Sequence, residues 1–309
     1  MTSAIILDCD PGHDDAIALM LALGSPEVRL LGVTTVSGNH TLENTTANAI
    51  RVLDYLGRED IPVAAGADRP LVRARRVSEA VHGQTGLDGP DLPPPARDPV
   101  PEHAIDWIAA TLAAHPDPVT LVATGPLTNI ALLLARYPEL YPRIERVVLM
   151  GGAIGLGNVT PAAEFNIWAD PEAAGRVFES GLDVTMAGLD VTHKALMHEQ
   201  HVERLAAGGC AGRLVADLYD FYVRHHRLRY AWDGAPVHDA VAMAHVIDPT
   251  LLEIKHRGVR IDTGGELSRG RTHVDLWGSA GWTPNCHVAV DIHDGRFFEL
   301  LIERISALN

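Results

Sequence analysis

The fold of this chain is decided near its start, by the sequence LDCDPGHDD at residues 7–15. An apolar run at residues 4–7 leads into this stretch and predicts a buried parallel strand. The apolar residues 16–21 follow it and predict a helix. The acidic side chains between them therefore fall on a strand-to-helix turn, at the carboxyl end of a strand. Open α/β sheets build their sites at such positions.

The same stretch predicts a divalent-cation site. It holds four aspartates within eight residues, and carboxylates this close repel one another unless a cation or a proton lies between them. Oxygen-only ligands suit a hard cation such as Ca²⁺ or Mg²⁺. A helix cap alone needs only one or two acids. An EF-hand is excluded, because its required glycine and glutamate positions hold His13 and Leu19 here.

The bulk composition limits the class of protein and the kind of partner. Of the 309 residues, 47% are hydrophobic and 21% are charged, which is ordinary for a soluble globular protein. The net charge of −15 argues against a nucleic acid partner and favours a neutral small molecule or a cation. Three scattered cysteines give no disulfide framework and no zinc spacing. With no transmembrane-length segment and no basic leader, we expect a cytoplasmic protein without a membrane partner.

The order of the predicted elements indicates an α/β fold. Strands are predicted at residues 28–36, 61–64, 119–123, 147–150 and 184–187, and helices at 41–56, 102–114, 214–229, 237–246 and 296–307. Further short strands are predicted near residue 259, at 273–274 and at 288–290. Such alternation is typical of an open, mostly parallel sheet flanked by helices. No internal repeat or change of composition marks a boundary, so we predict one domain over residues 1–309. The segment 70–101, rich in Pro and Gly, is too long for a connector and predicts an active-site loop.

Several polar motifs follow the predicted strands and show a family resemblance. These motifs are Val36–Asn39, Thr124–Asn129, Met150–Asn158, Glu164–Asn166 and Val237–Asp239. Together with the amino-terminal pattern Asp-x-Asp-Pro-Gly-x-Asp-Asp, they resemble the nucleoside hydrolases, in the same order, from about Ile5 to Val290. The resemblance implies the Rossmann-like fold of that family, a Ca²⁺ ion, and hydrolysis of the N-glycosidic bond of ribonucleosides to free base and ribose. His238 before Asp239 is similar to the inosine- and uridine-preferring branch.

The resemblance also implies roles for individual residues. Ca²⁺ would be held by Asp10, Asp15, Asp239 and the backbone carbonyl of Thr124. Asp10 would act as general base toward a water molecule that the ion activates, and the transition state would resemble an oxocarbenium ion. The ribose hydroxyls would be bound by Asp14, Asn39, Asn158, Glu164 and Asn166.

A histidine is the group best suited to protonate the departing base near neutral pH. His238 is the first candidate for this role and His82 is the second. Tyr230 and Arg229 would line the base pocket. His13 could reach the site, but we expect it to be an exposed loop residue; which of the three histidines is the main acid stays open.

The positions of four other aromatic residues are predicted from the sequence around them. His225 and His226 are predicted to lie on a helix surface. Trp168 and Trp232 are expected near the pocket, where they would alter the base preference. The sequence therefore leaves the choice between purine and pyrimidine bases open.

Two alternative functions fit parts of the pattern. Asp8-x-Asp10 after a strand resembles the nucleophile motif of haloacid-dehalogenase-like phosphatases, although Pro11 follows where Thr or Val is expected and lysine is scarce. A non-catalytic, calcium-dependent nucleoside-binding protein would use the same cation site without hydrolysis. Because nucleoside hydrolases are commonly dimers or tetramers, the resemblance also implies a homotetramer or a homodimer that acts on a small-molecule ribonucleoside.

Overall fold

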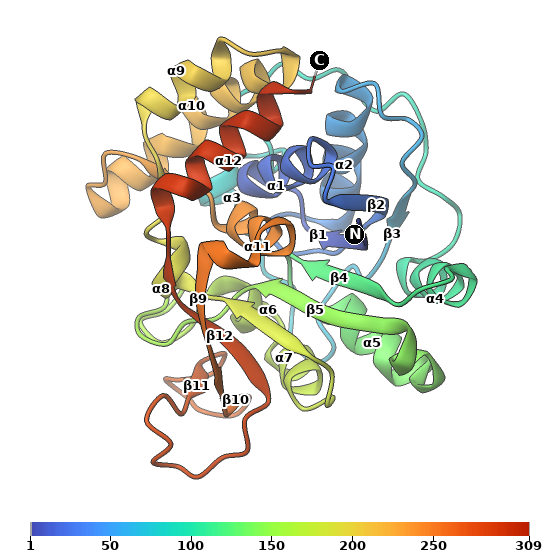
Figure 1. Cartoon of the computed structure of the whole chain (residues 1–309), viewed down its shortest axis with the longest axis vertical. Coiled ribbons are helices and arrows are strands. Elements are labelled where there is room, and N and C mark those ends of the chain that lie inside the picture. The colour runs from blue at the N-terminus through green and yellow to red at the C-terminus, as the bar shows by residue number, and fades with distance from the viewer. Residues whose placement is uncertain (1, 309) are drawn as a thin grey trace.

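The computed structural model describes residues 2–308 and shows an eight-stranded sheet with helices on both faces (Figure 1). Its strands, in spatial order, are β3 (Val63–Ala65), β2 (Val28–Thr35), β1 (Ser3–Cys9), β4 (Val119–Ala123), β5 (Ile144–Met150), β6 (Val184–Ala187), β12 (Cys286–Ile292) and β9 (Leu252–Arg257). Neighbouring strands of this sheet are parallel, except that β9 pairs antiparallel with β12. The predicted fold class, a single domain with an open and mostly parallel sheet, is confirmed.

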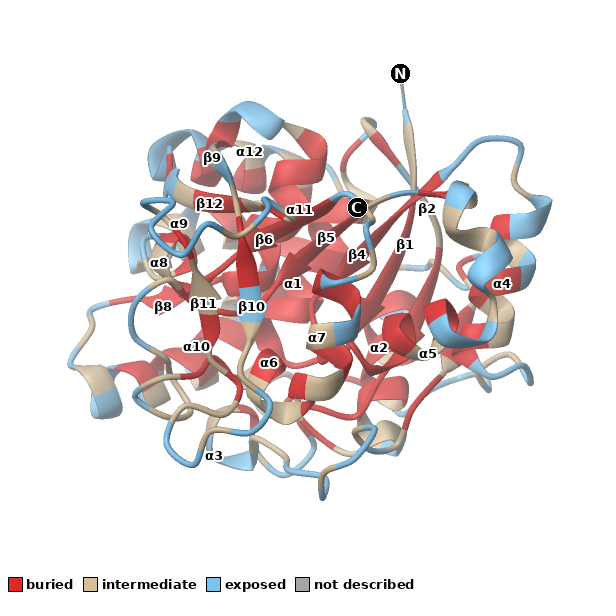
Figure 2. Cartoon of the chain, turned by 90° about the horizontal axis from the view of Figure 1, so that it is seen from below, coloured by how far each residue is buried: buried red, intermediate tan, exposed pale blue. Residues whose placement is uncertain are grey.

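The first strand shows why the strand sequences are almost continuously apolar. Leu7 packs into the core on one face of the sheet and Ile6 into the core on the other, and both side chains are fully buried. A parallel sheet covered by helices on both faces leaves no solvent side for polar residues. Figure 2 shows the central strands as a buried layer surrounded by exposed loops and outer helix surfaces.

Two sets of helices make the layers on either side of the sheet. One face is covered by α1 (His13–Leu23), α2 (Leu42–Tyr55), α10 (Cys210–Tyr230), α11 (His238–Ile247) and α12 (Asp294–Ser306), with α9 (Glu199–Ala206) outside them. The other face is covered by α4 (Ala104–Ala114), α5 (Thr128–Arg136) and α7 (Pro171–Phe178). Each set forms its own hydrophobic cluster, and the sheet separates the two clusters.

Several short elements were not expected from the sequence. These are α3 (Glu79–His82), α6 (Phe165–Ala169), α8 (Leu189–Thr192), the pair β7 (Leu196–Met197) and β8 (Ala235–Pro236), and two 3₁₀ turns at Pro138–Arg143 and Pro249–Leu251. The predicted short strands near residues 259 and 273 form a separate antiparallel hairpin, β10 (Val259–Ile261) with β11 (Thr272–Val274), which extends from the body of the molecule (Figure 1). β9 was also missed, because its outward positions are charged and its apolar pattern is weak.

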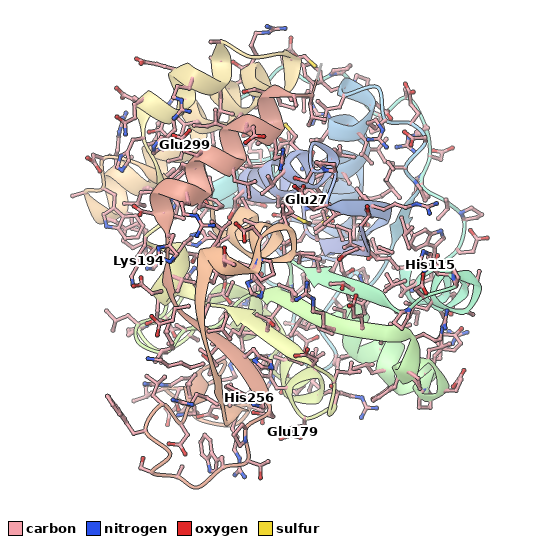
Figure 3. The ribbon with its side chains drawn as sticks, viewed as in Figure 1. Glu27, His115, Glu179, Lys194, His256 and Glu299 are labelled. Carbon is pink, nitrogen blue, oxygen red and sulfur yellow. The ribbon has the colours of Figure 1, made fainter. Side chains whose placement is uncertain are left out.

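Ion pairs at the surface join the carboxyl-terminal helix to its neighbours. Arg304 of α12 lies 2.6 Å from Glu27, and Arg204 of α9 lies 2.6 Å from Glu299 of α12. Figure 3 labels Glu27 and Glu299 at these positions. Such partly exposed pairs contribute about 0–1 kcal/mol each, so burial of Phe297, Leu301 and their neighbours holds α12 in place. No helix within residues 2–308 has the length and apolar character that a bilayer span requires.

Candidate active site

The loops that follow β1, β2, β4 and β5 meet at one edge of the sheet, because these parallel strands are neighbours. A cavity of about 260 Å³ opens at this edge. The predicted site residues that line it are Asp14, Asn39, His82, Thr124, Asn158, Glu164, Asn166, Arg229, Tyr230, His238 and Asp239. The two other predicted residues, Asp10 and Asp15, are buried and hydrogen-bonded to lining residues.

Asp15 connects three of the strand-end loops. Its Oδ2 accepts hydrogen bonds from the backbone N–H of Gly12 at 3.0 Å and from Nδ2 of Asn39 at 3.1 Å. Its Oδ1 accepts a hydrogen bond from the hydroxyl of Thr124 at 2.8 Å. Because the donors come from the loops after β1, β2 and β4, this carboxylate fixes the position of all three loops relative to the start of α1.

Asp10 is enclosed by backbone from two of these loops. Its Oδ2 accepts a hydrogen bond of 2.6 Å from the backbone N–H of Asn39. A Cβ atom at Gly38 or at Gly125 would collide with the Asp10 carboxylate, so both loops approach it as closely as glycine permits. Its Oδ1 is buried and has no hydrogen-bond partner among the described residues. One acceptor atom of Asp10 is therefore held in place and unused.

Three buried carboxylates form a compact acidic group in which the oxygens lie within 4.8 Å of one another: Asp14, Asp15 and Asp239. Burial, together with the charges of neighbouring carboxylates, raises the pKa of Asp14 to about 8 and raises the pKa of Asp239 as well. Burial also raises the pKa of Asp15. Burial and the charge of Asp15 likewise raise the pKa of Asp10. An all-oxygen donor set that repels itself, next to an unused oxygen of Asp10, fits a hard divalent cation.

Two details of the geometry bear on the predicted ligand set. Asp14, predicted as a ribose ligand, belongs to the compact group, whereas Asp10 lies beside it. The carbonyl oxygen of Thr124 accepts a hydrogen bond of 2.7 Å from Nδ2 of Asn166. A carbonyl oxygen has two lone pairs, so this bond leaves Thr124 able to ligate a cation.

The polar residues beyond the acidic group are fixed by the backbone around α6. Glu164 is the N-cap of this helix and accepts hydrogen bonds from the N–H of Asn166 and of Gly152, both at 2.9 Å. Burial raises the pKa of Glu164 to about 7. Asn158 accepts a hydrogen bond of 3.0 Å from the N–H of Phe165. These side chains are therefore positioned before any ligand arrives.

The two candidate acids face the same cavity from different elements. His238, at the start of α11, has its Nδ1 at 2.7 Å from the hydroxyl of Thr192. His82, in α3 within the 70–101 segment, has its Nδ1 at 3.1 Å from Nδ1 of His13. Burial lowers the pKa of both His82 and His238 well below the usual histidine range. Both rings are therefore neutral near pH 7 without a ligand.

The prediction that His13 is an exposed loop residue is wrong. His13 begins α1 and is fully buried. The 70–101 segment crosses over it, and the carbonyl oxygen of Asp88 lies 2.8 Å from Nε2 of His13. A contact between positions 75 residues apart has no local signature, so the exposure of His13 could not be judged from its neighbours in the sequence.

The prediction that His226 lies on a helix surface is also wrong. His226 is 4% exposed and lines the cavity, because this side of α10 faces the site. His225 lines the cavity as well and lies 3.0 Å from the carbonyl of Ala80 through Nδ1. Trp232 stacks on Tyr230 at 4.6 Å and lines the cavity, as expected. Trp168 is not part of the lining and instead contacts the guanidinium of Arg269.

Other lining or supporting residues were not predicted. Tyr222 of α10 stacks against His13 and His82, and His193 lies against both Trp232 and His238. Thr192 and His193 follow β6 at its carboxyl end. The rule that identified the other strand-end loops would have pointed to them, whereas the α10 residues carry no such positional signal.

Known proteins resemble this chain along nearly its whole length. The sequence model of the family described as inosine-uridine preferring nucleoside hydrolase matches residues 5–299. A protein named pyrimidine-specific ribonucleoside hydrolase RihA, from Citrobacter koseri, is 49% identical over 308 residues, which cover 99% of each chain. Its namesake from Salmonella arizonae is 50% identical with the same coverage.

Solved structures agree with these sequence matches. The plant nucleoside hydrolase PpNRh1 has a TM-score of 0.93 and 33% identity, and covers 99% of both chains. A purine-preferring ribonucleoside hydrolase from Gardnerella vaginalis has a TM-score of 0.92 and 35% identity with equal coverage. These similarities exclude the two alternative functions considered from the sequence, a haloacid-dehalogenase-like phosphatase and a non-catalytic nucleoside-binding protein. The chain belongs to the inosine-uridine preferring nucleoside hydrolase family and is a ribonucleoside hydrolase.

Proposed function

We propose that this enzyme hydrolyses pyrimidine ribonucleosides such as uridine to free base and ribose, with Ca²⁺ as its metal. The observation that carries the reaction is one cavity lined by both buried carboxylates and neutral histidines. The base preference is supported by the two relatives at 49% and 50% identity, which are named as pyrimidine-specific. The structure named as purine-preferring is more distant, at 35% identity.

Asp10, Asp15, Asp239 and the carbonyl of Thr124 are the proposed ligands of Ca²⁺. Support comes from the closeness of the Asp15 and Asp239 carboxylates. Asp10 would ligate the cation through Oδ2, which accepts only one hydrogen bond, and this leaves Oδ1 for the proton. When bound, the cation supplies Lewis acidity, which lowers the pKa of water in the site. Asp14, within reach of the same cation, is the proposed partner of a ribose hydroxyl.

Asp10 is the proposed general base. A water molecule adds to C1′ of the ribose as the bond between C1′ and the base breaks, and the proton that the water loses goes to Oδ1 of Asp10. Oδ1 of Asp10 is buried and has no hydrogen-bond partner among the described residues, so it is available to accept this proton. The remaining carboxylates stabilise the positive charge that develops on the sugar ring.

The ribose is held by groups that already have fixed positions. Asn39, Asn158, Glu164 and Asn166 are proposed to bind its hydroxyls with Asp14. Their backbone contacts leave carboxylate and amide atoms that can accept from or donate to neighbouring hydroxyl groups. Preorganisation of this kind lowers the entropy cost of reaching the reactive geometry.

The base is the leaving group, and His238 is the proposed acid that protonates it, with His82 as second donor. Since Nδ1 of His238 is occupied by Thr192 at 2.7 Å, the proton passes through Nε2. The 70–101 segment contributes Ser78, Ala80, Val81 and His82 to the cavity, which supports its role as an active-site loop. Tyr230 and Arg229 are proposed to contact the base. The assembly of the enzyme into a homodimer or homotetramer and its location in the cytoplasm stay predictions from the sequence.

A reducing-sugar assay over uridine, cytidine, inosine and adenosine tests the proposal. We expect ribose from uridine and cytidine at least about 10-fold faster than from inosine, and loss of activity with a chelator that only Ca²⁺ restores fully. Faster turnover of inosine would overturn the base preference. Full activity after exhaustive chelation would overturn the metal dependence.

A further inference from the structure

The loop after β5 carries Asn158, one of the proposed ribose ligands, and is held by side chains from other segments. Four consecutive backbone N–H groups, at residues 152–155, each donate a hydrogen bond to such a side chain. Glu164 accepts the first at 2.9 Å and Thr272 the second at 2.8 Å. Asp190 accepts the third and the fourth. This carboxylate does not line the cavity, and the proposed reaction does not yet use it.

Asp190 holds the part of the loop that lies nearest to Asn158 along the chain. Its Oδ2 accepts from the N–H of Ile154 at 2.6 Å, and its Oδ1 accepts from the N–H of Gly155 at 3.1 Å. Hydrogen bonds to an ionised acceptor are stronger than those between neutral groups. Because Gly155 and Leu156 are exposed, apolar packing contributes little here, and these two bonds determine where this part of the loop lies.

Beyond Gly155 the chain closes into a tight turn that carries Asn158. The backbone N–H groups of residues 158–160 all donate toward the carbonyl oxygen of Ala163, at 3.1, 3.3 and 3.4 Å. A Cβ atom at Gly157 would collide with the backbone of this turn. Since the turn is closed on itself, its position relative to the cavity depends on how its two ends are attached to the rest of the molecule.

The second attachment of the turn fixes the orientation of the Asn158 amide. The N–H of Phe165 donates to Oδ1 of Asn158 at 3.0 Å, and Nδ2 has no hydrogen-bond partner among the described residues. Asn158 lines the cavity, so Nδ2 can donate to a hydroxyl oxygen of the ribose. Such a bond weakens steeply with distance and angle, and a displacement of roughly 1 Å is enough to impair a site.

We infer that Asp190 is a positioning residue that holds the loop after β5, so that Nδ2 of Asn158 meets a ribose hydroxyl at hydrogen-bond distance. The inference rests on the proposed ribose-binding role of Asn158. Asp190 belongs to α8, at the carboxyl end of β6, and Thr192 of the same short helix contacts Nδ1 of His238. A single turn of helix therefore supports both the ribose loop and the proposed acid.

Hydrogen–deuterium exchange tests the attachment of the loop without any measurement of activity. The enzyme is kept in Ca²⁺ without substrate, and exchange is followed by mass spectrometry in a peptide that covers residues 151–163. In Asp190→Ala we expect its amides to exchange at least about 10-fold faster than in the wild type, with no change in peptides from β1 and β4. Asp190→Asn keeps one acceptor oxygen and should give an intermediate rate. Unchanged exchange over 151–163 in Asp190→Ala would overturn the inference.

Uridine and its 2′-, 3′- and 5′-deoxy analogues test the consequence for ribose binding. Asn158→Ala should lower kcat/KM on uridine about 10-fold, and the analogue on which it causes no loss identifies the hydroxyl that Asn158 binds. Asp190→Ala should lower kcat/KM on uridine about 3- to 10-fold, and less than about 2-fold on that same analogue. Asp190→Asn should recover most of the loss. Equal losses on uridine and all three analogues would mean that Asp190 only supports the fold.

Asp262→Ala is the matched control for Asp190→Ala. Asp262 also accepts hydrogen bonds from two consecutive backbone N–H groups of a loop, those of Gly264 and Gly265, and it lies outside the cavity lining. We expect kcat/KM of this variant to stay within about 2-fold of the wild type on all four substrates. A loss as large as that of Asp190→Ala would contradict the inference, because general destabilisation would then explain both.

The double variant separates this inference from the proposed function. In the Asn158→Ala background, Asp190→Ala should cause no further loss on uridine, because the two residues act as one unit. A further loss of about 10-fold would contradict the inference. If Asn158→Ala alone caused equal losses on uridine and every deoxy analogue, the proposed ribose-binding role of Asn158 would fail, while the exchange rates would still decide whether Asp190 holds the loop.

Discussion

The two ends of the cavity are built in different ways. The carboxylate end, formed by Asp10, Asp14, Asp15 and Asp239, lies within a few residues of strand ends or helix starts and is held by backbone and hydroxyl donors. The base end, formed by His82, His226, Arg229, Tyr230 and Trp232, comes from α3, α10 and the segment after it, and is held mainly by ring stacking. The carboxylates are therefore placed mainly by the sheet, whereas the side chains of the base end are placed mainly by segments outside it.

If this division is correct, the largest effect comes from Asp10→Asn. We expect kcat to fall about 10³-fold, because the variant lacks the proposed general base. The fall should be similar on uridine and nitrophenyl riboside, since both need the same water. Asp8→Asn is the matched control: Asp8 belongs to the same motif but bonds Thr34 and Asn129 outside the cavity. Steady-state kinetics measure this effect. If Asp10→Asn kept a tenth of the wild-type kcat, Asp10 would not be the general base.

The next largest effect is expected for His238→Ala, and it should depend on the leaving group. Turnover of uridine should fall about 10²-fold, whereas that of nitrophenyl riboside should change less than about 3-fold, because nitrophenolate leaves without a proton. Thr192→Val should give a smaller loss with the same selectivity, since it removes only the hydroxyl at 2.7 Å from Nδ1. Equal losses on the two substrates would remove His238 from the role of acid.

The carboxylate end should also make stability depend on pH when no cation is bound. The pKa of Asp14 is raised from 3.8 to about 8 in the folded chain, so its contribution to stability is full below about pH 4 and is lost as the pH rises toward 8. With a chelator, we expect Tm to fall from pH 5 to pH 8 by at least about 5 °C more than with Ca²⁺. If Tm changed equally between pH 5 and pH 8 with the chelator and with Ca²⁺, the result would contradict a cation site at this end.

The smallest effect is expected at the base end. Trp232→Ala removes a ring that stacks on Tyr230 and lines the cavity. We expect KM for uridine to rise about 10-fold, the size of one aromatic contact, with kcat within about 3-fold. Trp277→Ala, whose ring is 92% exposed and lies outside the cavity lining, is the control. A large fall in kcat for Trp232→Ala would contradict the assignment of base binding, without a part in bond breaking, to this residue.

The same division explains what the sequence could predict. The residues after β1, β2, β4 and β5 were placed correctly beside the cavity, because parallel strand ends meet at one edge. The environments of His13 and His226 were predicted wrongly, because burial depends on segments that pack over them from distant positions. β9 was missed because its alternation is short: only Leu252 and Ile254 are apolar, and polar residues follow them to the end of the strand.

The antiparallel strand β9 at one edge of the sheet has a consequence for self-association. Its Glu253, Lys255 and His256 side chains are exposed, and charged edges oppose the pairing of one sheet with another. At the opposite edge, β3 has only three residues, and Ala64 is bridged to Val100 of the following segment. Both borders of the large sheet therefore disfavour backbone pairing with a second copy. For a dimer or tetramer, this favours contact through side-chain surfaces over continuation of the large sheet from one subunit into the next.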